Sequence, residues 1–235
     1  ELADNAVDTA AIADSAVTAA KLAQGLIPRL PEWRAALAGA LAGGKARVSC
    51  VGDSWTFGFA ATDKWEDGFP NLLRRKLNQI APTRQGIILP SWNAINDPGR
   101  SFITVGSGWT TSAGYGPAGI GMLSAPAGTS AATSFGPFWC SGFIVYYMRR
   151  SNTGTFDIQI DSETAVNVGG TGADAIVSST VMASSTGSHT LNVKNVATNN
   201  VIIMGVEPIT GAAPGTGVYL SEAGAPGSKV ADWDD

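Results

Sequence analysis

The sequence predicts an α/β fold class with an inserted antiparallel β-sandwich, preceded by a repetitive N-terminal shaft. Three observations lead to this prediction. A short apolar run at Arg47–Val51 enters Gly-Asp-Ser and is followed by a helical pattern, which is the order strand, turn, helix. Six or more strand-like runs separated by turn residues occupy the region from about 99 to 212. The first 25 residues repeat with a period of ten.

Composition and charge exclude several classes of function. The 235 residues carry a formal net charge of −4 and only 14% charged residues, with 29 glycines, which is typical of a globular chain rich in strands and loops. The longest basic cluster is Arg74-Arg75-Lys76, so no nucleic-acid partner is expected. No apolar run approaches the ~20 residues of a membrane span. The acidic start ELADNAVDTA is not typical of a secretory signal.

The metal-ligating and redox-active residues are few. Cys50 and Cys140 are the only cysteines, and we expect two buried free thiols in preference to a disulfide. His189 is the only histidine, which argues against a metal site. We therefore expect neither a metal nor another cofactor.

The N-terminal repeat aligns as ELADN, AVDTAAIADS and AVTAAKLAQG. Large apolar residues recur every five positions, a spacing that fits neither a helix nor a strand. Such a unit cannot bury its apolar edge alone, so we interpret residues 1–27 as a shaft that winds with other copies of itself. The alternative is an Ala-rich linker. The segment 28–45 is then a collar, with a short helix predicted at Glu32–Leu41 and stopped by Gly43-Gly44.

This decapeptide pattern resembles the repeats of bacteriophage tail-fibre and minor tail proteins. The resemblance covers about a tenth of the chain. It implies a homotrimer, other tail or baseplate proteins as partners, and a place in the virion at the tail tip or fibre after assembly in the host cytoplasm. A shaft joined to a head also suits attachment to a host surface, because linked heads gain affinity through effective concentration.

Ser54 is the candidate nucleophile. It follows the predicted strand at the point where ligands bind in open α/β folds, and an amphipathic helix pattern begins near Trp65. A serine hydroxyl needs a base to take its proton and backbone N–H groups to receive the oxyanion. The alternative is that Ser54 only caps a polar turn.

GDSWTFG resembles the first block of the SGNH (GDSL-type) esterases and acylhydrolases, in which Ser54 matches the nucleophile. The resemblance implies a doubly wound α/β domain that hydrolyses acyl esters without a metal. EAGAPGS resembles the second block, so that Gly227 matches the oxyanion glycine, although Glu222 and Pro226 depart from the usual residues. The alternative there is a surface turn. We predict that 46–98 and 213–235 form this partial α/β domain around a sandwich at 99–212.

The other members of the catalytic triad are missing. His189 lies in a strand-like run, and Thr186 stands where an Asp-x-x-His pattern would need its acid, so we interpret His189 as a sheet histidine. Either the chain is part of a longer protein that holds the later blocks, which we prefer, or its α/β portion is a degenerate scaffold. We expect the chain by itself to be inactive, because an oxyanion hole alone retains little catalysis.

Aromatic residues in the β-rich region suggest contact with sugars. Trp109 and Tyr115 lie in a Gly-rich stretch and are the candidate substrate-binding residues, the alternative being core positions. Trp139, Phe143 and the Tyr146-Tyr147 pair lie in a strong strand and are interpreted as packing residues. The expected function is a phage tail protein whose head binds a host-surface glycan or lipid and carries an esterase signature. The alternatives are a stand-alone SGNH esterase and a purely structural virion assembly protein.

Overall fold

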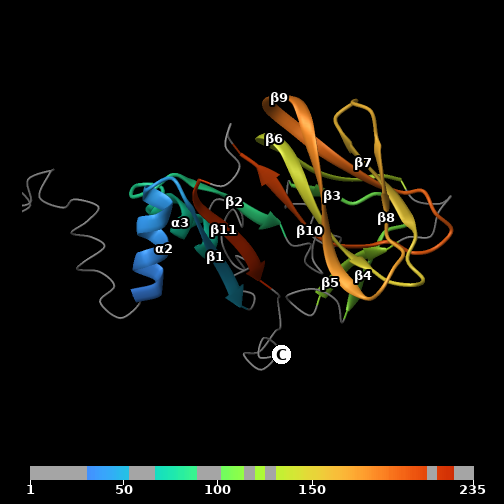
Figure 1. The fold of residues 1–235 in the computed structure, drawn as a ribbon, viewed down its shortest axis with the longest axis horizontal. Helices are drawn as coiled ribbons and strands as arrows, with labels where there is room; N and C mark the ends of the chain where they lie inside the picture. Colours follow the sequence, from blue (N-terminus) through green and yellow to red (C-terminus); the bar gives the residue numbers. More distant parts are fainter. Residues whose placement is uncertain are drawn as a thin grey trace, which may run out of the picture.

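The computed structural model describes residues 31–52, 67–88, 102–113, 120–124, 131–210 and 216–224. Figure 1 shows two helices beside a large sheet that curves across the molecule. The helices are α2 (Pro31–Leu41) and α3 (Phe69–Leu77). The strands are β1 (Lys45–Gly52), β2 (Thr83–Ile88), β3 (Ile103–Thr104), β4 (Thr110–Ala113), β5 (Ile120–Ser124), β6 (Thr133–Arg149), β7 (Thr155–Ile160), β8 (Val166–Gly169), β9 (Ala175–Asn195), β10 (Ile202–Ile209) and β11 (Gly217–Gly224).

Local signals place the helices where the sequence predicts them. Helix α2 begins at Pro31, whose fixed φ suits the first helical turn, and it ends before Gly43, which has a left-handed φ of 91°. Helix α3 likewise has Pro70 in its first turn and ends ahead of Pro82. The helix predicted at Glu32–Leu41 is therefore confirmed, whereas its role as a collar stays a prediction.

The predicted fold class is wrong. The described strands form one nine-stranded mixed sheet in the order β1-β11-β2-β10-β6-β9-β7-β8, with β3 paired to β6, and a separate β4-β5 pair. β2 runs parallel to β11 on one side and antiparallel to β10 on the other. Backbone hydrogen bonding thus continues from the helix-covered strands into the antiparallel ones, where the sequence analysis expected two separate sheets.

The helices also lie on one face of the sheet only. Both pack on a single apolar cluster. A doubly wound domain needs helices on both faces of its sheet. The cluster comprises Leu37, Ala40, Ala46, Cys50, Leu77, Ala81, Val218 and Leu220. The alternate positions of β1 and β11 point to the opposite face, which the described helices leave uncovered.

The antiparallel strands fold over a core of their own. β6 and β9 pair along most of their length, and register shifts near Gly136 and Ser141 divide the ladder into three segments. One half of the pair is flanked by β3 and β7, and the other half by β10. Side chains from both halves meet in one buried cluster, in which the rings of Tyr147 and Phe156 lie 5.0 Å apart. The packing of the two halves against each other resembles a β-sandwich. The runs AIVSSTVM and HTLNVKN, which the sequence suggested as separate strands, both belong to β9.

Candidate functional site

The carboxyl ends of β1 and β11 lie side by side. The two strands are parallel over their full length, from Lys45 opposite Gly217 to Gly52 opposite Gly224. Ser54 follows Gly52 by two residues and Gly227 follows Gly224 by three, and both lie outside the described residues. The two signature segments therefore begin at neighbouring strand ends. In open α/β sheets, ligands bind at the edge where the carboxyl ends of parallel strands meet.

A side chain fixes the third parallel strand at this edge. The register of β2 on β11 shifts between Leu220 and Glu222. At the shift, the Oγ of Ser221 accepts a hydrogen bond of 2.9 Å from the backbone N–H of Ile87. Gly86 faces this hydroxyl so closely that a Cβ at position 86 would collide with Ser221 and the Leu220 backbone. The buried hydroxyl of Ser221 thus accepts from a backbone N–H group that the irregular strand register would otherwise leave without an acceptor.

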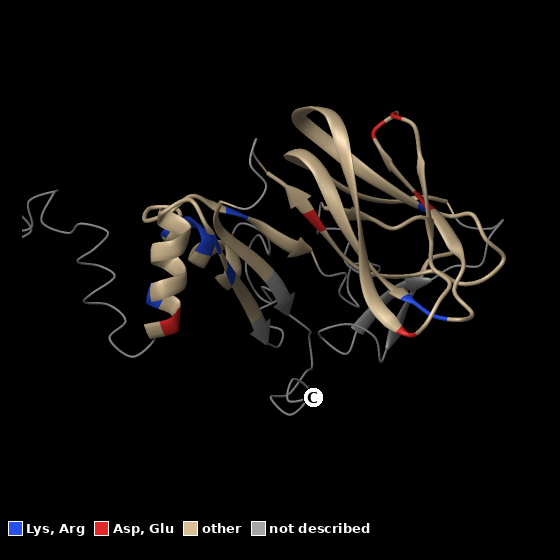
Figure 2. Ribbon diagram, viewed as in Figure 1, with Lys and Arg blue, Asp and Glu red and all other residues tan. Residues whose placement is uncertain are grey.

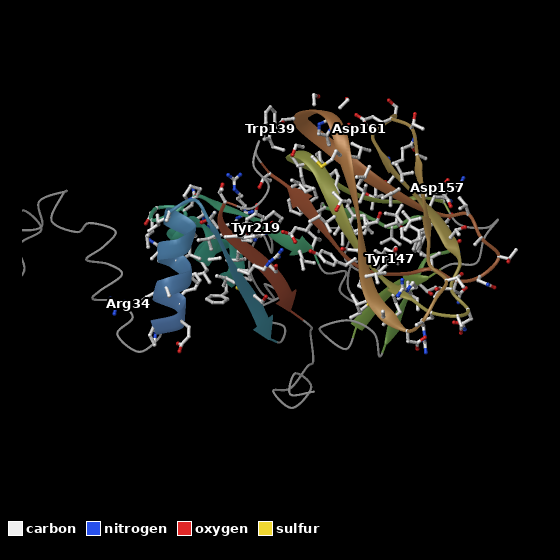
Figure 3. All side chains as sticks on the ribbon, viewed as in Figure 1. Arg34, Trp139, Tyr147, Asp157, Asp161 and Tyr219 are labelled. Carbon is white, nitrogen blue, oxygen red and sulfur yellow. The ribbon has the colours of Figure 1, made fainter. Side chains whose placement is uncertain are left out.

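The uncovered face of the sheet holds a cluster of charged residues around Glu207 of β10. The carboxylate, whose side chain is 2% exposed, accepts hydrogen bonds of 3.0 Å from Lys45 and 2.9 Å from Arg47, both on β1. The hydroxyl of Tyr146 on β6 donates to the same carboxylate at 3.0 Å. The Lys45 ammonium also lies 3.9 Å from the ring centre of Tyr219 on β11. Figure 3 shows Tyr219 between the helix-covered strands and the antiparallel ones.

The pKa values in this cluster follow from burial and pairing. Burial by itself raises the pKa of Glu207, but hydrogen bonds and charge from Lys45 and Arg47 outweigh it, so the pKa is lowered. Burial and the neighbouring carboxylate raise the pKa of the Tyr146 phenol. Lys45 and Arg47 stand at the amino end of β1, which puts them about 15–23 Å along the strand from Gly52. The cluster therefore joins strands at a distance from the carboxyl end of β1 and plays a structural part.

His189 lies in β9 and has an acidic partner that the sequence analysis did not identify. Its Nδ1 is 2.7 Å from a carboxylate oxygen of Asp161, at the end of β7, and its Nε2 is 2.9 Å from the backbone carbonyl oxygen of Ser185. Both partners are acceptors, so both ring nitrogens carry protons and the imidazolium form is favoured. The hydrogen bond to Asp161 raises the pKa of His189, and the same bond lowers the pKa of Asp161.

This geometry removes His189 as the base for Ser54. A general base needs a free nitrogen lone pair, and here both nitrogens donate. The ring is also 10% exposed and lies at the edge of the antiparallel core. The interpretation of His189 as a sheet histidine is confirmed by its place in β9. Asp161 was missed because it precedes the histidine by 28 residues and meets it only through the pairing of β7 with β9.

We expect the stability supplied by this pair to depend on pH. The pKa of His189 is raised, so its contribution is present below about 6.5 and is lost as the pH rises through the folded value. The pKa of Asp161 is lowered, so its contribution is lost as the pH falls below about 3.8. The melting temperature of Asp161→Asn should therefore fall furthest below wild type near pH 5, and less at pH 8.5. Asn167→Ala, a neutral exposed control, should show a constant difference. An equal Asp161→Asn deficit at both pH values would contradict the assignment.

The aromatic residues are placed differently from the prediction. Trp109 is 4% exposed, packs in the antiparallel core and donates its Nε1–H to the carbonyl of Ala131 at 2.7 Å. It offers no free face to a sugar, because the core covers its ring. Tyr115 lies outside the described residues. Trp139, interpreted from the sequence as packing, is instead 71% exposed.

Strand alternation explains why Trp139 is exposed, and this alternation is already visible in the sequence. Its neighbours Phe138 and Cys140 are both in the antiparallel core, so the residue between them points to the other face of β6. Phe143 and Tyr147 are in the core as predicted, whereas Tyr146 belongs to the Glu207 cluster.

Other kinds of site are not found in the described part of the chain. No group of three or more His, Cys, Asp or Glu side chains there is placed to hold a metal ion. Cys50 and Cys140 are buried free thiols, which confirms that expectation. Among the described residues, no helix is long and apolar enough to cross a membrane.

Comparisons with known proteins identify no family. The chain matches no protein-family description and no curated protein. Among solved structures it is similar to a family GH115 4-O-methyl-α-glucuronidase with specificity for decorated arabinogalactans, at 14% identity and a TM-score of 0.36, covering 53% of this chain and 17% of that one. It is also similar to the CBM22-1–GH10 modules of Clostridium thermocellum endo-1,4-β-D-xylanase 10B complexed with xylohexaose, at 15% identity and a TM-score of 0.28, covering 45% and 24%. The chain thus spans well under two thirds of the length of either protein.

Proposed function

We propose that this chain belongs to a phage tail protein that presents a serine esterase centre, built around Ser54, to acylated glycans or lipids of the host envelope. The N-terminal decapeptide repeat supports the tail assignment, and GDSWTFG supports the chemistry. The single structural observation that supports the site is the parallel register that brings Gly52 beside Gly224. The two strands that lead into the signature segments are neighbours, although 171 residues separate their ends in the sequence.

The proposed reaction is acyl transfer to Ser54 and then to water. The Ser54 oxygen attacks the ester carbonyl while a base takes its proton, and the oxyanion that forms is held by backbone N–H groups, for which Ser54 and Gly227 are the candidates. The alcohol leaves with the proton, and water then releases the acid and regenerates the hydroxyl. We propose that a residue outside this sequence supplies the base, because both ring nitrogens of its only histidine are engaged by Asp161 and Ser185.

Covalent labelling tests this proposal directly. The product of the complete native gene is incubated with a fluorophosphonate, which phosphonylates an activated serine and loses fluoride, and the adduct is mapped by mass spectrometry. We expect rapid, single labelling at Ser54 in that protein and slow or no labelling in the 235-residue chain. A native gene product that is not labelled at Ser54 contradicts the esterase centre.

A second candidate is a tail head that binds or assembles without catalysing a reaction. The observation that favours it is the engagement of both nitrogens of His189, which leaves Ser54 without a histidine base in this sequence. The labelling experiment separates the two, because a purely binding or structural head has no activated serine.

A further inference from the structure

The outer face of the β6–β9 pair carries an exposed indole on a rigid strand. Trp139 is 71% exposed, and its side chain projects from the middle part of β6 away from the core (Figure 3). The backbone beneath it is anchored on both sides, because Phe138 and Cys140 are buried in the antiparallel core. An anchored indole offers a large flat apolar surface with a polar N–H at its edge and loses little conformational freedom on binding.

Two more exposed apolar side chains lie on the same outer face. Met182 is 52% exposed and stands opposite Gly142, where a Cβ would come within 3.0 Å of the Met182 sulfur. Ile176 is 59% exposed and stands opposite Met148. Three of the eight large exposed apolar side chains of the described residues thus lie on one strand pair. Exposed apolar side chains that gather on one surface are more typical of a binding site than single ones spread over the protein.

Between these apolar residues the face is lined by hydroxyl groups. Ser188 is paired with Trp139, Thr180 with Ile144, and Ser178 with Tyr146, and all three hydroxyl residues are exposed. The strip from Trp139 to Tyr146 covers about 20 Å of strand, which is long enough for several sugar rings.

The two strands themselves contribute no charged side chain to the central part of this face, and the charges that border it are the carboxylate of Glu163, which accepts hydrogen bonds from Ser184 of β9, and the Glu207 cluster beside Tyr146. β6 contains no Lys, Arg, Asp or Glu between Thr133 and Met148, and β9 contains none between Ala175 and Leu191. In Figure 2 both strands are uncoloured along most of their length. On the neighbouring strand β10, the Glu207 carboxylate is buried and paired with Lys45 and Arg47. The β6–β9 strands themselves offer an acidic or basic ligand no opposite charge, whereas a neutral ligand with both C–H faces and hydroxyl groups matches their indole and hydroxyl side chains.

We propose that this outer face, from Trp139 through Ser188, Met182 and Thr180 to Ser178, binds a neutral oligosaccharide, with one sugar ring stacked on the Trp139 indole. The inference deepens the proposed function, on which it rests for the host-surface origin of the glycan. The residues of this face belong to β6 and β9 and do not include Ser54 or Gly227. The test of the inference therefore measures glycan binding, and its outcome does not depend on ester hydrolysis.

Affinity electrophoresis of the 235-residue chain tests the proposal. Native gels contain dextran, mannan or galactan as neutral probes and polygalacturonate as an acidic probe. We expect retardation by at least one neutral polysaccharide and none by polygalacturonate. Trp139→Ala should weaken the interaction at least about tenfold, because central indoles dominate such interfaces. Trp139→Phe should retain part of it, and Phe69→Ala, which removes an exposed aromatic ring on α3, should leave it unchanged.

The other outcomes overturn the proposal. Retardation by none of the neutral probes, or equal retardation of wild type and Trp139→Ala, removes the glycan site. A loss of oligomeric mass in Trp139→Ala, measured by light scattering, would assign the face to a second copy of the chain instead. Thermal unfolding of each variant serves as the folding control, and an exposed Trp139 makes a large change unexpected.

Discussion

Replacing Ser54 by alanine is expected to reduce ester hydrolysis by the complete native gene product at least about 10³-fold. The substitution removes the atom that forms the acyl intermediate and leaves only the rate supplied by oxyanion stabilisation and binding. The measurement is kcat/KM for a chromogenic acetyl ester. The 235-residue chain should show no more than this residual rate, with or without Ser54, because its only histidine is engaged in the ion pair with Asp161.

Ser49→Ala is the matched control for this prediction. Ser49 is an exposed serine of β1, five residues before Ser54 in the sequence, and its loss should leave kcat/KM unchanged. Equal rates for wild type and Ser54→Ala in the complete protein would show that GDSWTFG is a turn without catalytic function. The tail head would then be a binding or structural module.

Removing both cations from the Glu207 cluster is expected to lower the free energy of unfolding by about 2–3 kcal/mol at pH 7. In Lys45→Ala/Arg47→Ala the carboxylate of Glu207 stays buried with Tyr146 as its remaining partner, and an uncompensated buried charge is costly. The figure lies below that of a fully buried pair because the Arg47 side chain is 43% exposed. Urea unfolding followed by circular dichroism measures the change.

The pH dependence of this effect identifies its cause. In wild type the pKa of Glu207 is lowered, so its contribution is present above about 4.5 and is lost as the pH falls through the folded value. In the double variant no cation opposes burial, which is expected to raise that pKa although Tyr146 still donates to the carboxylate, so the deficit should shrink at pH 4 as the carboxyl protonates. Adding Glu207→Gln should recover much of the stability at pH 7. Lys76→Ala, an exposed lysine on α3, should change stability by less than about 0.5 kcal/mol.

A deficit that is the same at pH 4 and pH 7, and that Glu207→Gln does not relieve, would mean that Lys45 and Arg47 act through packing of their aliphatic stems. Lys45 contacts the ring of Tyr219, so this alternative has a definite structural origin.

Local sequence signals were sufficient for individual elements and insufficient for their arrangement. Pro31 and Gly43 mark the ends of α2, and alternation in TFDIQI places Phe156 and Ile158 in the core, because caps and side-chain periodicity act over a few residues. The same alternation in β6 predicts an exposed Trp139 between the core residues Phe138 and Cys140. The change in composition near Pro98 suggested a separate module, but β2, which precedes that boundary, pairs with β10 of the predicted insert as well as with β11.

The sequence by itself determined the strand that precedes Ser54, the two helices α2 and α3, the alternating core positions of β7 and the free state of Cys50 and Cys140. Only the tertiary structure decided that β11 lies beside β1, that Asp161 meets His189, that Glu207 lies beneath Lys45 and Arg47, and that Trp109 is buried while Trp139 is exposed. The physical reason is that strand pairing joins residues up to 172 positions apart. Caps and periodicity are local interactions, and they do not specify which distant strand provides the next row of hydrogen bonds.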